Sequence, residues 1–367
     1  MVRQIVFRQV VVFLLIIPVF TYAGNDPPQK HKQKVPRNII LMIGDGMGSA
    51  QLYTCITVKG DKCNIAHFPY SGFVKTYSAD SYITDSGAGA TAYATGHKTN
   101  NGYISVSPEG KNLKTILETA ESKGLATGLV ATSAITHATP AGFIAHTSNR
   151  GNMDDIARDF LKTDIDVFIG GGYDNFAHRK DSINLIDSLR AHKYTIARDL
   201  KDVDVPNVSK LAALLADGPM PRISAGRGSM LPDATEMALK LLKRNKKGFF
   251  LMVEGSQIDW GGHDNDLNYV VDETVDFDNA VGKAIEFAKK DGETLIIVTA
   301  DHETGGLALT GGDIKTGKVQ GSFVYKDHTA VMVPIFAFGP GSEQFTGLME
   351  NTDVYKKCMA LYGFKLP

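Results

Sequence analysis

The sequence is short of cysteine, of tryptophan and of long apolar runs. Its 367 residues include three cysteines and one tryptophan. None of the cysteines has the CxxC spacing of a zinc or redox motif, which excludes those kinds of cysteine site. Lysine and arginine (39) do not outnumber aspartate and glutamate (40). Because no basic tract stands out, we expect no binding to nucleic acid.

The one marked apolar run lies near the N-terminus, at residues 10–20. Arg3 and Arg8 precede this run and small residues around Ala23 follow it, which is the layout of a secretory signal peptide. The run is shorter than the roughly 20 apolar residues that a membrane-spanning helix needs, so we expect no membrane anchor in the mature chain. We predict a signal peptide over residues 1–23, cleavage after Ala23, and a periplasmic or secreted protein.

Apolar stretches of strand length alternate with helical patterns along the rest of the chain. Strands are expected at residues 38–43, 72–78, 126–132, 167–169, 249–253, 294–299 and 333–338. The spacing of apolar residues predicts helices over residues 112–123, 155–161, 182–192, 233–243 and 268–289. This alternation predicts an α/β fold with a central, mainly parallel sheet flanked by helices. No repeat or linker divides it, so we expect one domain over residues 24–367.

The stretch TDSGAGATAYATGHKTNNG, residues 84–102, places the hydroxyl of Ser86 beside the carboxylate of Asp85. The alanines and glycines of residues 87–94 suit a helix that packs tightly on a sheet. Free N–H groups at the start of such a helix favour an anion. The same residues also suit an ordinary helix N-cap. Taken alone, this stretch leaves both interpretations open.

Acidic residues and histidines recur where the predicted strands end or begin. In chain order they are Asp45, Glu254, Asp259, His263, Asp301, His302, Glu303 and His328. Ligands of parallel sheets bind beyond the carboxyl ends of the strands, so we expect these side chains to lie close together. Carboxylate and imidazole are ligands for zinc, and carboxylate alone suits magnesium. The clusters therefore predict a metal site.

The motifs that carry these residues resemble those of the alkaline phosphatase family. They are GDGMG, the stretch around Ser86, THATPAG, AHTSNR, VEGSQID, TADHETGG and HTAVMVP, in the family's order from Asp45 to His328. The resemblance implies hydrolysis of phosphate monoesters through a phosphoserine intermediate, with small-molecule esters as substrates. It also implies an alkaline-phosphatase-like catalytic domain and a homodimer.

The resemblance further implies a role for each matched residue. Ser86 would be the nucleophile, and Arg150 would bind two phosphate oxygens. The ligands of the first zinc ion would be Asp45, Asp301 and His302. Those of the second would be Asp259, His263 and His328. Those of a magnesium ion would be Asp45, Thr139 and Glu254. Two zinc ions about 4 Å apart would activate the serine and hold the leaving oxygen.

Two positions depart from the best-known bacterial pattern of this family. His137 and Trp260 stand where several bacterial members have aspartate and lysine. We expect both side chains to line the third metal site. Because oxygen ligands suit magnesium and imidazole suits zinc, we predict that this site holds magnesium less tightly and can be entered by zinc.

The sequence leaves several alternatives open. A phosphodiesterase or a phosphomutase of the same superfamily would share many of these residues, and a non-catalytic periplasmic zinc-binding protein would share the ligands. A nucleotide-binding protein is disfavoured, because neither GDGMG nor GHKT has the spacing of a phosphate-binding loop. In an exported protein, Cys55 and Cys63 are near enough in sequence for a disulfide.

Overall fold

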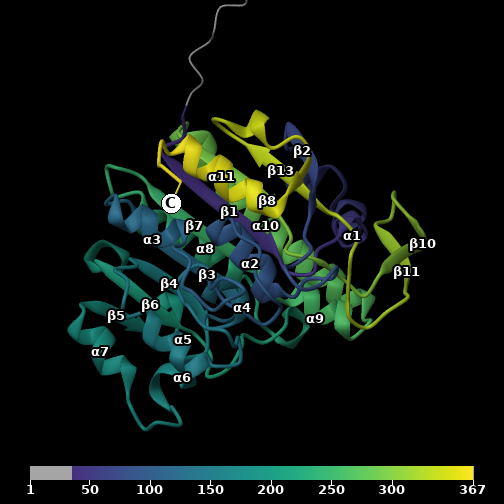
Figure 1. The fold of residues 1–367 in the computed structure, drawn as a ribbon. Coiled ribbons are helices and arrows are strands. Elements are labelled where there is room, and N and C mark those ends of the chain that lie inside the picture. The colour runs from purple at the N-terminus through teal and green to yellow at the C-terminus, as the bar shows by residue number, and fades with distance from the viewer. Residues whose placement is uncertain (1–34, 367) are drawn as a thin grey trace, which may run out of the picture. The chain divides into compact units, whose positions relative to one another are not determined.

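The computed structural model describes residues 35–366. The predicted signal peptide and its cleavage site lie outside the described residues. Ten strands of the described part form one sheet, in the order β14-β2-β13-β8-β1-β7-β3-β4-β6-β5 (Figure 1). Every paired neighbour in this sheet runs parallel except β13, which is antiparallel to both β2 and β8. The predicted mainly parallel sheet is confirmed.

The strands and helices have the following bounds. The strands of the large sheet are β1 (Asn38–Gly44), β2 (Tyr70–Lys75), β3 (Ala126–Ala134), β4 (Val167–Gly171), β5 (Tyr194–Ala197), β6 (Lys210–Leu214), β7 (Phe249–Gly255), β8 (Thr294–Thr299), β13 (Val333–Phe338) and β14 (Gly347–Glu350). Two small sheets consist of β9 (Glu303–Thr304) with β12 (His328–Thr329), and of β10 (Leu307–Asp313) with β11 (Lys318–Phe323). The α-helices are α1 (Ser49–Lys59), α2 (Ser86–Thr95), α3 (Ile116–Ser122), α4 (Ala138–Ala141), α5 (Met153–Asp159), α6 (Tyr173–Ala177), α7 (Leu185–Ala191), α8 (Met230–Leu242), α9 (Gln257–His263), α10 (Leu267–Asp291) and α11 (Asn351–Leu361).

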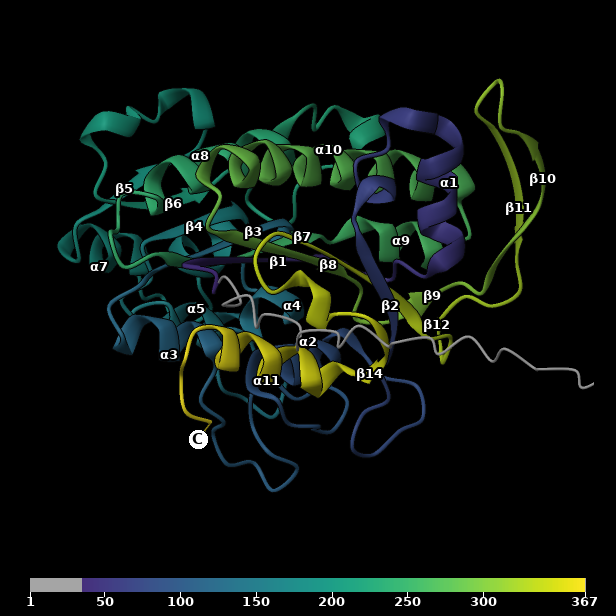
Figure 2. The ribbon, with the colours of Figure 1, turned by 90° about the horizontal axis from the view of Figure 1, so that it is seen from above.

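Helices cover both faces of the sheet, as Figure 2 shows. Helices α1, α8, α9 and α10 lie on one face, and α2, α3, α4 and α11 lie on the other. The central strands are therefore buried on both sides, and every residue of β1, β7 and β8 is buried. This double cover explains why these strands read as continuous apolar runs rather than as alternating patterns. No helix of residues 35–366 has the combined length and apolarity needed to cross a membrane.

Several elements were not expected from the sequence. The helix α1, the edge strands β5 and β14, the strand β6 beside β5, and the C-terminal helix α11 lie in segments to which no element was assigned. The hairpin of β10 and β11 projects beside the sheet (Figures 1 and 2). Its exposed and half-buried residues alternate along β11, so no apolar run marks it.

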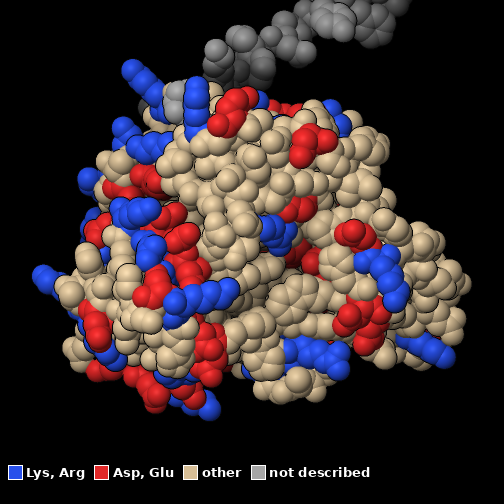
Figure 3. Space-filling model, turned by 60° about the horizontal axis from the view of Figure 1, so that its bottom comes forward, with Lys and Arg blue, Asp and Glu red and all other residues tan. Residues whose placement is uncertain are grey.

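Charges of both signs are mixed on the surface. On the face drawn in Figure 3, lysine and arginine are interspersed with aspartate and glutamate, and acidic and basic groups meet in a hollow near the centre. Surface pairs such as Arg190 with Asp187, at 2.9 Å, illustrate this mixing. Exposed pairs of this kind contribute little to stability.

Cys55 and Cys63 lie side by side but are free thiols. Their Sγ atoms are 3.7 Å apart and both side chains are buried. A disulfide needs the two sulfur atoms at about 2.05 Å, so the bond suggested by their proximity in sequence is not formed in this structure. Instead, the Cys63 thiol lies 3.6 Å from a carboxylate oxygen of Asp278 on α10.

Asp85 fixes the start of α2, the helix that begins with Ser86. Its Oδ1 accepts a hydrogen bond from the N–H of Ala88 at 2.9 Å, and its Oδ2 accepts one from the N–H of Gly102 at the same distance. The helix is fully buried, and a Cβ added to Gly89 would lie 3.0 Å from the Cβ of Asp301. Only small residues allow α2 to approach the loop after β8 this closely.

We therefore expect Asp85→Ala to lower the free energy of unfolding by about 1–2 kcal/mol, because it removes the N-cap acceptor. Asp85→Asn retains a cap oxygen and serves as the matched control, which should lose clearly less. Urea denaturation followed by circular dichroism measures both variants. Equal stability of the alanine and asparagine variants would contradict the capping role.

Candidate metal centre

The predicted ligands lie at one edge of the sheet, beyond the ends of four neighbouring strands. In sheet order these strands are β8, β1, β7 and β3. Asp301 and His302 follow β8, Asp45 follows β1, Glu254 ends β7, and Thr139 lies in α4 after β3. Parallel strands place their carboxyl ends at the same edge. The sheet therefore brings together residues that are more than 200 positions apart in sequence.

The first group consists of Asp45, Asp301 and His302. The Nε2 atom of His302 lies 3.4 Å from Oδ1 of Asp45 and 3.4 Å from Oδ2 of Asp301. All three side chains are fully buried. The hydroxyl of Ser86 is 3.3 Å from the same Nε2 atom. The predicted nucleophile thus adjoins the first predicted zinc site.

The second group consists of Asp259, His263 and His328. Asp259 and His263 lie on α9, whose helical spacing brings His263 Nε2 to 3.3 Å from Asp259 Oδ1. His328, on β12, places its Nε2 3.5 Å from the same oxygen and 3.1 Å from Nε2 of His263. Its ring stacks on that of His302, with centroids 3.5 Å apart. The first and second groups are therefore direct neighbours.

The third group lies on the other side of Asp45. The ligand atoms of Asp45, His137 and Glu254 lie within 4.8 Å of one another. The hydroxyl of Thr139 donates to Oδ2 of Asp45 at 3.5 Å. His137 meets the ring of Trp260 edge to face, with centroids 6.1 Å apart. Together His137 and Trp260 line a cavity of about 310 Å³, whose lining includes none of Asp45, Thr139 and Glu254.

Arg150 completes the arrangement. Its Nη1 donates to Oδ2 of Asp85 at 2.8 Å, so the residue that caps α2 also holds the guanidinium near Ser86. Burial lowers the pKa of Arg150, but Asp85 outweighs it and raises that pKa. The guanidinium therefore stays charged beside the start of α2, whose N-terminus also favours an anion.

Burial dominates the electrostatics of the acidic ligands. It raises the pKa of Asp45 well above its usual value, that of Glu254 to about 7 and that of Asp301 to about 6. Neighbouring carboxylates raise the pKa of Asp45 further. Asp259 differs, because hydrogen bonds from His263 and His328 outweigh burial and lower its pKa. Each of the other three carboxyl groups therefore holds its proton more tightly than in water unless a cation lies beside it.

The donor set fits divalent metal ions. Asp45 Oδ1, Glu254 Oε1, Asp301 Oδ2 and His137 Nδ1 are buried and have no hydrogen-bond partner within the described residues. Buried polar atoms are seldom left unpaired, and these four belong to residues of the first and third groups. Burial also lowers the pKa of His137 to about 4 and that of His302 well below its usual value, so both imidazoles are neutral and able to bind a metal.

Sequence reasoning missed two polar residues at this edge. The Thr304 hydroxyl donates to Oδ1 of Asp259 at 2.5 Å and lies 3.2 Å from Nδ1 of His302, so it touches a ligand of each predicted zinc site. Asp327 has a carboxylate oxygen near the ligand nitrogens of His263 and His328. Its position directly before His328 was the only signal in the sequence.

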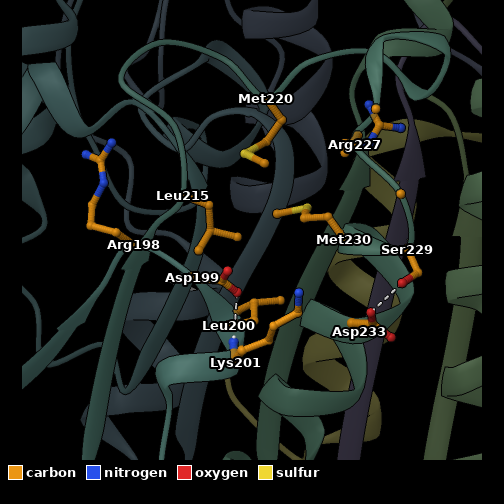
Figure 4. A pocket seen from close by; sticks show the side chains of 12 residues that line it. Arg198, Asp199, Leu200, Lys201, Leu215, Met220, Arg227, Ser229, Met230 and Asp233 are labelled. Atoms are coloured by element: carbon orange, nitrogen blue, oxygen red, sulfur yellow. Dashed lines mark hydrogen bonds between the residues drawn. The ribbon is translucent and has the colours of Figure 1, made fainter.

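A second cavity, of about 450 Å³, lies between β6 and the start of α8 (Figure 4). Met220 and Met230 face each other across it. Two hydrogen bonds lie within its lining, since Ser229 donates to Asp233 at 2.5 Å and Asp199 accepts from the N–H of Lys201 at 2.9 Å. It contains none of the predicted site residues, so the edge of the sheet remains the candidate site.

Comparison with known proteins agrees with this arrangement. The sequence profile of the family described as Alkaline phosphatase matches residues 36–322. Alkaline phosphatase 3 of Bacillus subtilis is 37% identical, over 91% of this chain and 90% of its own length. Alkaline phosphatase of Escherichia coli is 33% identical, over 90% of this chain and 87% of its own length.

Solved structures give the same result. Alkaline phosphatase from the Antarctic bacterium TAB5 superposes with a TM-score of 0.87 at 41% identity, covering 91% of this chain and 100% of its own. A histidine-to-aspartate mutant of that enzyme, solved with Mg bound in its M3 site, matches with the same TM-score at 40% identity over the same shares of both chains. The chain belongs to the alkaline phosphatase family.

Proposed function

We propose that this chain hydrolyses phosphate monoesters through a phosphoserine intermediate on Ser86, with two zinc ions and one magnesium ion. One observation carries the proposal: the Ser86 hydroxyl lies 3.3 Å from His302, at the start of a buried helix and beside three groups of ligands. Membership of the alkaline phosphatase family supports metal-dependent hydrolysis of monoesters. The two zinc ions, the magnesium ion and the phosphoserine intermediate are proposed in addition to what family membership supports.

In this proposal, Asp45, Asp301 and His302 hold one zinc ion, and Asp259, His263 and His328 hold the other. When bound, the metals would lower the pKa of the serine hydroxyl and stabilise charge on the entering and leaving oxygens. The Ser86 hydroxyl releases its proton to solvent, its oxygen forms a bond to phosphorus while the bond to the ester oxygen breaks, and the leaving alkoxide takes a proton from water. Water then hydrolyses the phosphoserine and releases inorganic phosphate.

Arg150 and the start of α2 bind the phosphoryl group. A guanidinium has five N–H donors in a planar fork, so one can pair with Asp85 while others contact two phosphate oxygens. Transfer of a phosphoryl group spreads charge over its equatorial oxygens, where such donors are effective. The ion pair of 2.8 Å with Asp85 restrains Arg150 before substrate arrives. That restraint reduces the entropy lost on binding.

At the third site, Asp45, Thr139 and Glu254 are the proposed magnesium ligands. His137 offers an imidazole nitrogen within 4.8 Å of the carboxylates of Asp45 and Glu254. Imidazole suits zinc better than magnesium. We therefore infer that this site holds magnesium weakly and can exchange it for zinc, which is the consequence of having histidine rather than aspartate at this position.

We further propose that the mature protein is exported and forms a homodimer. Tyr77, Tyr82, Val331 and Met332, which we call the Tyr82 patch, line one cavity of about 400 Å³. Tyr82 is 80% exposed and Val331 is 50% exposed. Clustered apolar exposure of this kind marks an interaction surface, and a second copy of the chain is its proposed occupant.

The serine assignment can be tested by trapping. After an acid quench of turnover on a labelled monoester, we expect label on Ser86 and on no other residue. Ser86→Ala should lower kcat about 100-fold or more, because the covalent route is lost. Ser107→Ala, in the loop after α2, is the matched control. Label on another residue, or a normal kcat for Ser86→Ala, would show that the nucleophile is wrong.

The third site can be tested with His137→Asp. An added carboxylate should tighten Mg²⁺ binding about tenfold, which corresponds to about 1.4 kcal/mol. Calorimetric titration of Mg²⁺ into the zinc-loaded, magnesium-free variant measures the change. His137→Asn removes the imidazole without adding charge and is the control. If the aspartate and asparagine variants bind Mg²⁺ equally, charge at this position does not set the affinity.

The proposed dimer can be tested at the Tyr82 patch. Changing Tyr82→Ser together with Val331→Asp should shift the equilibrium from dimer to monomer, because burying a charge in an apolar interface is costly. Sedimentation equilibrium measures the mass. Ile314→Asp, at an exposed apolar residue beyond β10, should leave the mass unchanged. An unaltered dimer in the patch variant would place the interface elsewhere.

A further inference from the structure

Glu303 lies between two residues of the metal centre but belongs to none of its three ligand groups. It is 3% exposed, and it stands between His302 and Thr304. Its partners are all neutral donors. Oε1 accepts from the Gln51 side-chain amide at 2.6 Å and from the N–H of Leu307 at 3.2 Å. Oε2 accepts from the N–H of Gly306 at 3.2 Å and from the Thr329 hydroxyl.

These donors come from three separate segments of the chain. Gln51 lies on α1, Gly306 precedes β10 and Leu307 begins it, and Thr329 lies on β12. Gln51 also donates to the carbonyl of Thr304 at 2.8 Å. One carboxylate thus ties the first turn of α1 to both strands of the β9–β12 pair.

The packing around Glu303 is equally close. A Cβ on Gly48 would collide with the Cγ atom of Glu303, so the turn between β1 and α1 lies directly against this side chain. Asp45 belongs to that turn. Glu303 pairs with Thr329 across the β9–β12 ladder, and Thr304 pairs with His328. The Glu303 side chain therefore packs against the backbone segments that carry Asp45, His302 and His328.

We propose that Glu303 is a positioning residue that fixes His328 relative to His302 and Asp45, and that it thereby sets the affinity of both predicted zinc sites. The proposal rests on the proposed zinc-dependent function. Residues that orient metal ligands typically change metal affinity 10- to 100-fold when mutated, on the order of the effect expected here. The alternative is that Glu303 only stabilises the fold, as other buried hydrogen-bonded groups do.

The test acts through the partners of Glu303. Removing the carboxylate itself would take an acceptor from four buried or part-buried donors at once and threaten folding. Thr329→Val deletes one donor at nearly constant volume, and Thr329→Ser keeps the hydroxyl. Gln51→Leu deletes the donor on α1. Thr235→Val, which removes a buried hydroxyl from α8 at a hydrogen bond of 2.8 Å, is the remote control.

Zn²⁺ affinity is measured without substrate, by competition with a chromophoric chelator, and stability of the metal-free proteins by urea denaturation. We expect Thr329→Val and Gln51→Leu each to weaken Zn²⁺ binding about tenfold, on the order of other second-sphere changes. Thr329→Ser and Thr235→Val should bind like the parent. The double variant should lose less than the product of the single losses, because both donors act through one carboxylate.

Two outcomes would overturn the proposal, and they differ. If the parent binds Zn²⁺ but Thr329→Val and Gln51→Leu bind it equally well and lose only stability, Glu303 is a structural residue and the proposed function stands. If the parent binds no Zn²⁺ at these sites, the proposed function fails and the positioning role fails with it.

Discussion

Repulsion between carboxylates buried at one edge of the sheet is the constraint on which the site depends. Asp45, Glu254 and Asp301 have raised pKa values because burial disfavours their charge. These buried carboxyl groups can all be ionised only where cations lie close to them. Arg150 supplies part of the positive charge, and divalent ions would supply the rest. Metal binding and folding would then be coupled, since a bound ion offsets a repulsion that the empty site must tolerate.

The rest of the fold makes this crowding geometrically possible. Strands buried on both faces form a rigid platform, and their ends deliver the ligands to one edge. Helix α2 reaches the same edge because its small residues let it approach closely, as at Gly89 against Asp301. Gly46 has φ +72 and lies where a Cβ would be 2.7 Å from Cα of Asp259. Glycine is required at this turn both by its conformation and by the space available.

Much of this arrangement could be predicted from the sequence. The elements and residues that were missed leave no pattern in the sequence, for physical reasons. Buried parallel strands leave continuous apolar runs, so β1, β7 and β8 were found within about one or two residues. The strand β6, with sequence KLAAL, has no β-branched residue and gives no such signal. The motifs indicated the ligands by resemblance. Thr304 was missed because a single hydroxyl has no periodicity, and its contact with Asp259 exists only once α9 packs against β9.

His137 and Trp260 show how side chains can change the charge at this edge while the sheet stays the same. Neither side chain brings a fixed charge: burial lowers the pKa of His137 to about 4, and an indole is neutral. In the proposed function, the wall of the third site would therefore neither attract magnesium as aspartate would nor hold phosphate as lysine would. Arg150 would then be the side-chain cation for the phosphoryl group. Weaker binding of phosphate favours its release, and product release limits turnover in many enzymes. His137 and Trp260 would therefore lower the affinity for phosphate and speed its release.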